Sequence, residues 1–170
     1  GLYRCHYLDF SRPEEQNLHE LQRLGVSAVI ATPSTILPLA VRNLERNEPI
    51  GFKRFFSYAE VLSKEARTIL SRSFGCSVYD RYGAVETGSI AWECPEGGMH
   101  IYSDSLIVEI VDGNGDAVPY GRSGSIVLTP LWRRSMPLIR YKIGDRAAFV
   151  GRCRCGRGLP LLRSIEGREA

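Results

Sequence analysis

The sequence has no apolar run long enough to cross a bilayer, and it does not open with a signal-peptide pattern. Both absences favour a soluble, cytoplasmic protein with no membrane partner. The only two methionines are Met99 and Met136, so no initiator methionine stands at the start. From the first residue, Gly1, and the last, Ala170, we expect a piece of a longer protein.

Cysteine is scarce and odd in number. Five cysteines without a secretory signal argue against a framework of disulfides. Three of them form a group with one histidine, at the ends of a Gly-rich loop and on a second loop some fifty residues later: Cys94, His100, Cys153 and Cys155. Three thiolates and one imidazole suit a tetrahedral, structural Zn²⁺. Free thiols or a disulfide between the loops are the alternatives.

The other two cysteines, Cys5 and Cys76, lie in strand-like runs, and we expect both to be buried core thiols.

Charge of one sign is missing from part of the chain. Residues 91–116 hold six acidic side chains and no Lys or Arg, whereas residues 117–170 hold eleven basic and three acidic side chains. The basic end could meet the phosphates of a nucleotide or of nucleic acid. The alternative is a solvated face that the acidic block offsets.

The first half of the chain alternates helical and strand patterns, and 44% hydrophobic with 24% charged residues is typical of a folded protein. We expect strands at 3–10, 26–31, 53–58 and 76–80. Helices should begin at a Ser11 cap, run over Thr35–Asn43 with Pro38 in the first turn, and follow a Ser63 cap. This alternation predicts an α/β fold, a layered subdomain with a mostly parallel sheet.

After about Ala91 the pattern changes to period two. Strands are expected at 106–111, 125–129, 137–141 and 146–150, with a strong turn over Asp112–Asp116. We therefore predict a small β-rich, barrel-like subdomain. The predicted division is 1–91, 92–165 and a short segment at 166–170.

One stretch, residues 78–88, carries several groups that could bind a ligand. A strand ends there in Tyr82-Gly83, and Glu86 follows. Tyr offers a flat face, Gly lets backbone come close to a ligand, and Glu can hold Mg²⁺. Taken alone, the stretch reads as a strand that ends in an ordinary Gly turn.

Two charged residues near the end of the chain add to this. Asp145, exposed by the Gly144 turn, could accept hydrogen bonds from both hydroxyls of a ribose, or it is a plain turn residue. Arg168, after Gly167, could bind phosphate or ribose, or be solvated.

Read together, these motifs resemble the adenylate-forming superfamily, and most closely its phenylacetate–CoA ligase branch with the capsular-polysaccharide-type relatives. The resemblance runs through Thr32-Pro33-Ser34, Tyr58-Ala59-Glu60-Val61-Leu62, Tyr82-Gly83-Ala84-Val85-Glu86, Glu93-Cys94 to His100, Met136 to Asp145, Cys153 to Arg157, and Gly167-Arg168. The order and spacing of several motifs make it more specific than any one of them.

The resemblance implies an acyl-CoA synthetase-like enzyme that adenylates a carboxylate with ATP and passes the acyl group to CoA or another acceptor. It implies that Ala59 and Glu60 flank the adenine and that Tyr82 and Gly83 pack on it. Glu86 would hold Mg²⁺, and Asp145 and Arg168 would bind the ribose. The group Cys94, His100, Cys153 and Cys155 would match the zinc site of that branch.

The sequence departs from the family pattern in ways that bear on activity. Val85 replaces a hydroxyl residue that contacts phosphate, a role that Thr87 could take over, and Tyr58 replaces a Gly beside the base. The Gly/Ser/Thr-rich phosphate loop and the catalytic Lys domain are not in these 170 residues. We therefore expect that the piece alone does not complete adenylation, and we read 166–170 as the start of a hinge.

Two other readings remain. The chain could be a degenerate, non-catalytic relative that binds a nucleotide or a partner, which Val85 and Tyr58 motivate. It could also be a zinc-stapled nucleic-acid binder, but it lacks interleaved aromatics and a reading element, so nucleic acid is not an expected partner. A homodimer stays open, and the acyl substrate is not encoded here.

Overall fold

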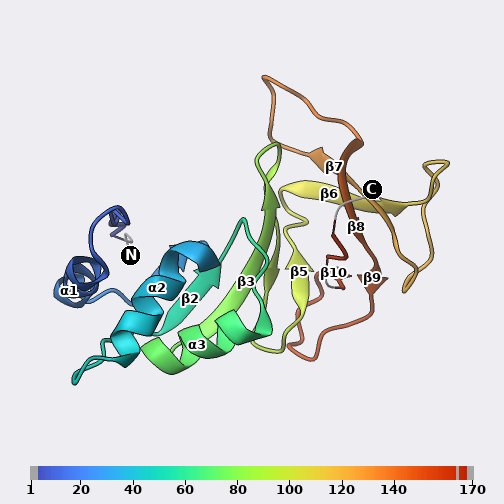
Figure 1. Ribbon diagram of the computed structural model, residues 1–170. Helices are drawn as coiled ribbons and strands as arrows, with labels where there is room; N and C mark the ends of the chain where they lie inside the picture. Colours follow the sequence, from blue (N-terminus) through green and yellow to red (C-terminus); the bar gives the residue numbers. More distant parts are fainter. Residues whose placement is uncertain (1–3, 164, 168–170) are drawn as a thin grey trace. The chain divides into compact units, whose positions relative to one another are not determined.

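The computed structural model describes residues 4–163 and 165–167 and divides the chain into two compact units after Asp80 (Figure 1). Each unit has a hydrophobic core of its own. The three helices contain 11, 12 and 11 residues, and none in the described part of the chain is long and apolar enough to cross a membrane.

The first unit alternates helices and strands. In chain order it contains α1 (Glu14–Leu24), β1 (Ala28–Ala31), α2 (Pro33–Leu44), β2 (Arg54–Ser57), α3 (Lys64–Phe74) and the beginning of β3 (Ser77–Ala84). β1 pairs with β2 in parallel, and β2 pairs in parallel with the first four residues of β3. The predicted α/β fold with a parallel sheet is confirmed for this unit.

Apolar side chains at helical spacing bind the three helices to this sheet. Each helix turns one apolar face inward, as a period of 3.6 residues requires. The core so formed includes Leu18, Leu21, Val29, Ile36, Leu39, Phe55, Leu70 and Phe74. Burying one large side chain of this kind contributes roughly 1.5–3 kcal/mol.

The ends of the helices follow local chemistry. Ser63 caps α3 as predicted, since its Oγ accepts a 3.0 Å hydrogen bond from the amide of Ala66. α1 ends at Gly25 in the left-handed region (φ 56°), where glycine meets no steric penalty.

The predicted start of α1 is wrong. Pro13 is its N-cap and no side chain caps it, because the hydroxyl of Ser11 donates to Asp9 Oδ1 at 2.6 Å instead. The strand expected at 3–10 does not form over residues 4–9. Pro38 lies inside α2, beyond its first turn, because the helix begins earlier than expected, at Pro33.

The second unit consists of two antiparallel sheets. The end of β3 pairs with β4 (Gly88–Glu93), followed by β5 (Met99–Ile101), β10 (Leu161–Leu162) and β9 (Phe149–Val150). The other sheet contains β6 (Leu106–Val111), β7 (Gly124–Pro130) and β8 (Tyr141–Ala147). The β-rich character is confirmed, while a barrel shape stays a prediction.

Pairing explains where the units divide. The residues of β3 after Asp80 form a hairpin with β4, so their contacts belong to the second unit and the boundary lies before residue 91. The assignment of functions to the sequence-defined domains stays a prediction. The core of this unit is built from both sheets and includes Ile90, Ile101, Leu106, Ile110, Ile126, Leu128, Ala147 and Leu162.

The strand expected at 137–141 is wrong, since β8 begins only at Tyr141. Arg140 has a φ of 50°, which an extended strand does not allow, and its amide donates to Thr129 Oγ1 at 2.9 Å rather than to a strand partner. The turn at Asp112 forms as predicted, because its Oδ1 accepts the amides of Asn114 and Asp116.

Candidate functional site

The β3–β4 hairpin carries four of the residues that the sequence singled out. Tyr82 and Gly83 lie at the end of β3, and Glu86 and Thr87 lie in the turn, which a 3.2 Å hydrogen bond from the Thr87 amide to the Ala84 carbonyl closes. Glu86 is exposed. A single exposed carboxylate fits Mg²⁺, which is usually bound through one or two carboxylates, substrate phosphates and water.

Gly83 is needed by the hairpin itself. A Cβ atom at this position would lie 2.7 Å from the carbonyl oxygen of Gly88 on β4, closer than a real contact allows. The register of the hairpin shifts here, between Tyr82 and Gly83. The glycine therefore has a structural reason that is independent of any ligand.

Asp145 lies on a bulge in β8. Lys142 pairs with Val127 and Arg146 with Ser125, so three residues of β8, including Asp145, stand opposite a single residue of β7. Gly144 takes a φ of 84° in this bulge, a conformation that glycine adopts readily. Because Asp145 is part of the bulge, its side chain departs from the regular alternation of the strand.

A hydrogen bond joins the hairpin to the bulge. The phenol Oη of Tyr82 donates to Asp145 Oδ2 at 2.6 Å, and both side chains are half-buried. The short distance is typical of a hydroxyl that donates to an ionised carboxylate. Two residues that the sequence assigned to one ligand are thus in contact.

Val85, at which the sequence departs from the family pattern, and Thr87, which could take over its role, differ in exposure. The side chain of Val85 is 95% exposed, whereas Thr87 is 3% exposed. Among the described residues, the hydroxyl of Thr87 has no hydrogen-bond partner. The hydroxyl of Thr87 is thus buried and does not face solvent. Its role at a phosphate stays a prediction.

Two further predicted residues lie in the first unit, directly after β2. Ala59 has a φ of 65°, in the left-handed region that costs non-glycine residues about 1–2 kcal/mol. The carboxylate of Glu60 accepts two hydrogen bonds from Ser34 at the start of α2. Arg168, the remaining predicted residue, lies outside the described residues.

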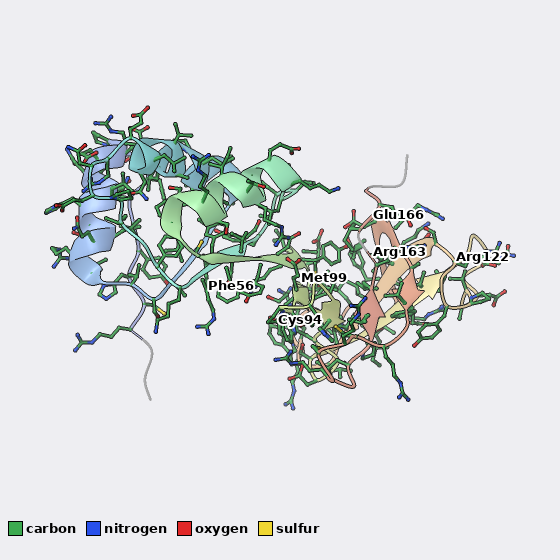
Figure 2. The ribbon with its side chains drawn as sticks, turned by 90° about the horizontal axis from the view of Figure 1, so that it is seen from below. Phe56, Cys94, Met99, Arg122, Arg163 and Glu166 are labelled. Carbon is green, nitrogen blue, oxygen red and sulfur yellow. The ribbon has the colours of Figure 1, made fainter. Side chains whose placement is uncertain are left out.

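The four metal-ligand candidates come together. Their ligand atoms all lie within 4.8 Å of one another, with Cys94 and His100 buried and Cys153 and Cys155 half-buried. Cys94 follows β4 and precedes the loop to β5, whose first residue is Met99 (Figure 2). The thiols of Cys94 and Cys153 are 3.5 Å apart, and Cys155 Sγ is 3.2 Å from His100 Nε2.

These separations fit a tetrahedral ion. Ligands around zinc would lie about 3.8 Å apart for two sulfurs and about 3.6 Å apart for sulfur and nitrogen. The cysteines are free in the structure, so no disulfide occupies the group. The buried Nδ1 of His100 has no hydrogen-bond partner among the described residues.

The thiols differ in acidity. A hydrogen bond from the backbone of Arg157 is the largest cause that lowers the pKa of Cys155, to about 6. For Cys153 a backbone hydrogen bond from Cys155 lowers the pKa, but burial and the neighbouring thiols outweigh it and the pKa is raised. A lowered pKa favours the thiolate of Cys155, and the thiolate is the form that binds metals.

Two neighbours of this group, Gly98 and Trp92, were not singled out from the sequence. Gly98 leaves room for it, because a Cβ there would lie 2.7 Å from Cys153 Sγ. Trp92 packs on His100 with ring centroids 5.3 Å apart, and the guanidinium of Arg157 lies over the Trp92 ring. Trp92 could have been predicted as a neighbour, since it lies two residues before Cys94, a spacing that favours one side of an extended chain.

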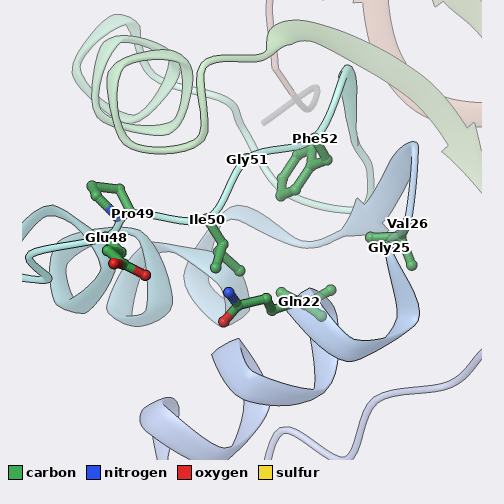
Figure 3. A pocket seen from close by; sticks show the side chains of 9 residues that line it. Gln22, Gly25, Val26, Glu48, Pro49, Ile50, Gly51 and Phe52 are labelled. Atoms are coloured by element: carbon green, nitrogen blue, oxygen red, sulfur yellow. The ribbon is translucent and has the colours of Figure 1, made fainter.

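A pocket of ≈ 320 Å³ lies elsewhere, in the first unit (Figure 3). Gln22 and Gly25 at the end of α1 form one side, and the loop from Glu48 to Phe52 forms the other. None of the predicted site residues in the described part of the chain lines it. The chemistry-bearing groups therefore do not coincide with this hollow.

No family model matches the chain. Curated relatives include the phenylacetate-coenzyme A ligases of Thermus thermophilus, 29% identical over 163 residues, and of Pseudomonas putida, 32% identical over 166 residues. Both alignments cover 91% of this chain but 37% of the relative. The chain thus spans a little over a third of the length of these relatives.

Solved structures of acyl-CoA ligases are also similar to the chain. A 2-hydroxyisobutyryl-CoA ligase in complex with 2-HIB-AMP and CoA is 28% identical with a TM-score of 0.81, covering 91% of this chain and 39% of that chain. A long-chain-fatty-acid-CoA ligase of Archaeoglobus fulgidus shares the fold at 12% identity, with a TM-score of 0.64 over 89% of this chain and 36% of that one.

In both sequence and fold, the chain is related to the adenylate-forming acyl-CoA ligase superfamily. Within it, the curated relatives of this chain named above are phenylacetate-coenzyme A ligases.

Proposed function

We propose that this chain is part of an ATP-dependent ligase that adenylates a carboxylate. A carboxylate oxygen forms a bond to the α-phosphorus of ATP, the bond to the β-phosphate bridge breaks, and pyrophosphate leaves. An acceptor, CoA in the related ligases, then attacks the acyl carbon and AMP leaves. Because the chain spans only a little over a third of its relatives, this activity is proposed for the longer protein.

The residues take the roles that the family motif gives them. Tyr82 and Gly83 pack on the adenine, Ala59 and Glu60 flank it, and Asp145 and Arg168 bind the ribose. Thr87 supplies the hydroxyl that Val85 lacks. Glu86 holds Mg²⁺, and a bound cation offsets the charge that develops on the phosphates.

The hydrogen bond between Tyr82 and Asp145 carries this proposal. A ribose site needs a carboxylate whose direction is fixed, and a base site beside it needs a flat ring. The bond holds one of each together, on elements that the sequence separates by 63 residues. Asp145 accepts this bond from the phenol hydroxyl of Tyr82, so one contact joins the two motifs.

We further propose that Cys94, His100, Cys153 and Cys155 hold a structural Zn²⁺. The support is the donor set and the separations of 3.5 Å and 3.2 Å between ligand atoms. A closed set of four protein ligands leaves no position for a substrate, so the ion would fold the loops rather than catalyse.

The test is calorimetry of AMP binding to the full-length protein in the presence of Mg²⁺. Asp145→Ala should weaken AMP binding at least about tenfold, since a ribose loses a charged acceptor. Asp104→Ala, which removes an exposed carboxylate of the same unit, is the matched control. Absence of any AMP or ATP binding by the unaltered protein would contradict the proposal.

One observation favours a second function, that of a non-catalytic relative. The position that carries a phosphate-binding hydroxyl in the family is an exposed valine, and the neighbouring Thr87 hydroxyl is buried. Such a protein would bind AMP without releasing pyrophosphate from ATP. Pyrophosphate release by the full-length protein with any carboxylate would exclude it.

A further inference from the structure

The start of α2 lacks a cap from its own residues. Its N-cap is Thr32, whose side chain makes no capping hydrogen bond. The amides of Thr35 and Ile36 reach the Thr32 carbonyl, and Pro33 has no amide hydrogen to satisfy. Ser34 is thus the residue whose amide needs an acceptor from elsewhere.

Glu60 supplies that acceptor from 26 residues further along the chain. The Ser34 amide donates to Glu60 Oε2 at 2.9 Å, and the Ser34 hydroxyl donates to Oε1 at 2.5 Å. The hydroxyl and then the amide of Ser34 lower the pKa of Glu60. A carboxylate at a helix N-terminus is also favoured by the helix dipole. Both carboxylate oxygens are engaged within the first unit.

Ala59, the residue before Glu60, has a backbone conformation that its surroundings must stabilise. Ala59 has a φ of 65°, and a strained backbone of this kind persists only where its surroundings fix it. On one side Ser57 is fixed by the pairing of β2 with β1 and β3. On the other side Glu60 is fixed on α2. Ala59 is held between these two points.

This loop lies where a ligand is expected. It follows the carboxyl end of β2 in a parallel sheet, and α/β proteins bind ligands beyond those ends. An exposed carboxylate is ionised at neutral pH whether or not a neighbour donates to it. The hydrogen bonds from Ser34 are therefore not needed for the charge of Glu60 but matter for its position. They fix the position of the backbone around Ala59.

We propose that Glu60 is a positioning residue, whose carboxylate, held by Ser34, fixes the Tyr58–Glu60 backbone in the conformation that packs against the adenine. In this role the carboxylate of Glu60 binds Ser34, while the backbone of Ala59 and Glu60 flanks the adenine. The proposal rests on the proposed nucleotide site. It also gives Ser34, in the Thr32-Pro33-Ser34 motif, a role 26 residues from its partner.

The effect of Ser34 separates positioning from direct contact. Ser34→Ala removes one hydrogen bond to Glu60 but leaves the carboxylate in place. If the carboxylate of Glu60 bound the adenine itself, Glu60→Ala would weaken AMP binding and Ser34→Ala would leave it unchanged. If Glu60 acts through the loop, we expect Ser34→Ala and Glu60→Ala both to weaken AMP binding, roughly threefold and tenfold. The double variant should be no weaker than Glu60→Ala alone.

The measurement is calorimetry of AMP on the full-length protein, with ribose 5-phosphate as a competitor that lacks the base. Neither variant should change the affinity for ribose 5-phosphate, because the loop meets only the adenine. A general loss of folding would weaken both ligands equally. Glu14→Ala, an exposed carboxylate in the first turn of α1, is the matched control and should change neither affinity.

Amide hydrogen exchange in the absence of nucleotide tests whether Glu60 fixes the loop after β2. Glu60→Ala should speed exchange at Ser34 and over residues 58–62 but not at Ala66, whose amide the Ser63 cap protects. If the unaltered protein binds AMP and the two variants bind it equally well, positioning is wrong and the nucleotide site stands. If the unaltered protein does not bind AMP, both proposals fall.

Discussion

Tyr82 and Asp145 are joined by a 2.6 Å hydrogen bond, although 63 residues separate them in the chain. The bond links the β3–β4 hairpin to the bulge of β8 inside the second unit. It restricts the ring of Tyr82 and the carboxylate of Asp145 at the same time. The proposed base and ribose contacts are therefore coupled, and a change at one should be felt at the other.

Tyr82→Phe tests this coupling. The variant keeps the ring and removes only the hydroxyl, so Asp145 loses a donor. A hydrogen bond to a charged group contributes about 1.5–3 kcal/mol when buried, and half-burial favours the lower end. We expect the free energy of unfolding to fall by about 1.5 kcal/mol and the Kd for AMP to rise severalfold.

Urea denaturation and calorimetry measure the two effects. Tyr120→Phe is the matched control, because Tyr120 is 70% exposed and packs on Phe149 through its ring, which phenylalanine retains. Equal results for the two variants would show that the bond between Tyr82 and Asp145 fixes nothing.

The proposed zinc site predicts both the metal content and the thermal stability of the protein. We expect about one zinc ion per chain in protein purified without chelator, and its loss in Cys153→Ala. Structural zinc contributes several kcal/mol or more to folding. Because 1 kcal/mol shifts Tm by about 2–4 °C at this size, removal of the ion should lower Tm by on the order of 10 °C.

Cys5→Ala is the control for this experiment, since Cys5 is an exposed thiol outside the group. Elemental analysis and thermal unfolding with and without chelator give the answer. Zinc content that does not differ between the two variants would contradict the site. A covalent link between Cys94 and Cys153 under non-reducing mass spectrometry would favour the disulfide alternative instead.

Sequence patterns predicted the elements whose signals are local. The period of Leu18 and Leu21, the Ser63 cap and the Asp112 turn each depend on residues within a few positions of one another, and the structure has all three. Grouping of the cysteines with His100 was also readable, because few residue types bind metals. The expectation for Cys76 is right and that for Cys5 is wrong, as Cys5 is exposed.

Relationships over long distances could not be read from the pattern. β10 contains two residues, Leu161 and Leu162, too few for a period, and it exists only because β5 and β9 lie on both sides of it. The cap of α2 comes from Glu60, which no local rule connects with Ser34. No local rule connects Asp145 with Tyr82 either, since 63 residues separate them.

Gly83 provides a test of packing that needs no ligand. Gly83→Ala would put a Cβ 2.7 Å from the Gly88 carbonyl oxygen, and the backbone of β4 would have to move. Overpacking of this kind costs about 1–3 kcal/mol. Gly113→Ala is the matched control, because nothing lies within 4 Å of its added Cβ and its φ is not positive.

Urea denaturation of the two variants gives the comparison. We expect Gly83→Ala to unfold at a lower urea concentration than the unaltered protein, while Gly113→Ala unfolds close to it. If both variants behaved alike, the close approach of β3 and β4 would not be what requires glycine, and contact with the nucleotide would become the better explanation.

Cys76 predicts a dependence of stability on pH. Burial raises the pKa of its thiol from 9.0 to about 11. Above pH 9 the unfolded chain releases this proton, which lowers its free energy, whereas the folded chain keeps the proton until about pH 11. The contribution to stability is therefore complete below pH 9 and is lost between pH 9 and 11, at up to about 1.4 kcal/mol per pH unit.

Cys76→Ala isolates this effect from the other groups that titrate in the same range. The variant has a constant packing cost but no thiol, so the difference in unfolding free energy between it and the unaltered protein should shrink as pH rises from 9 to 11. Urea denaturation at pH 8, 9, 10 and 11 measures that difference. A difference that stayed constant would mean that the thiol ionises as easily in the folded protein as in the unfolded chain, and that Leu70 and its neighbours do not shield it from water.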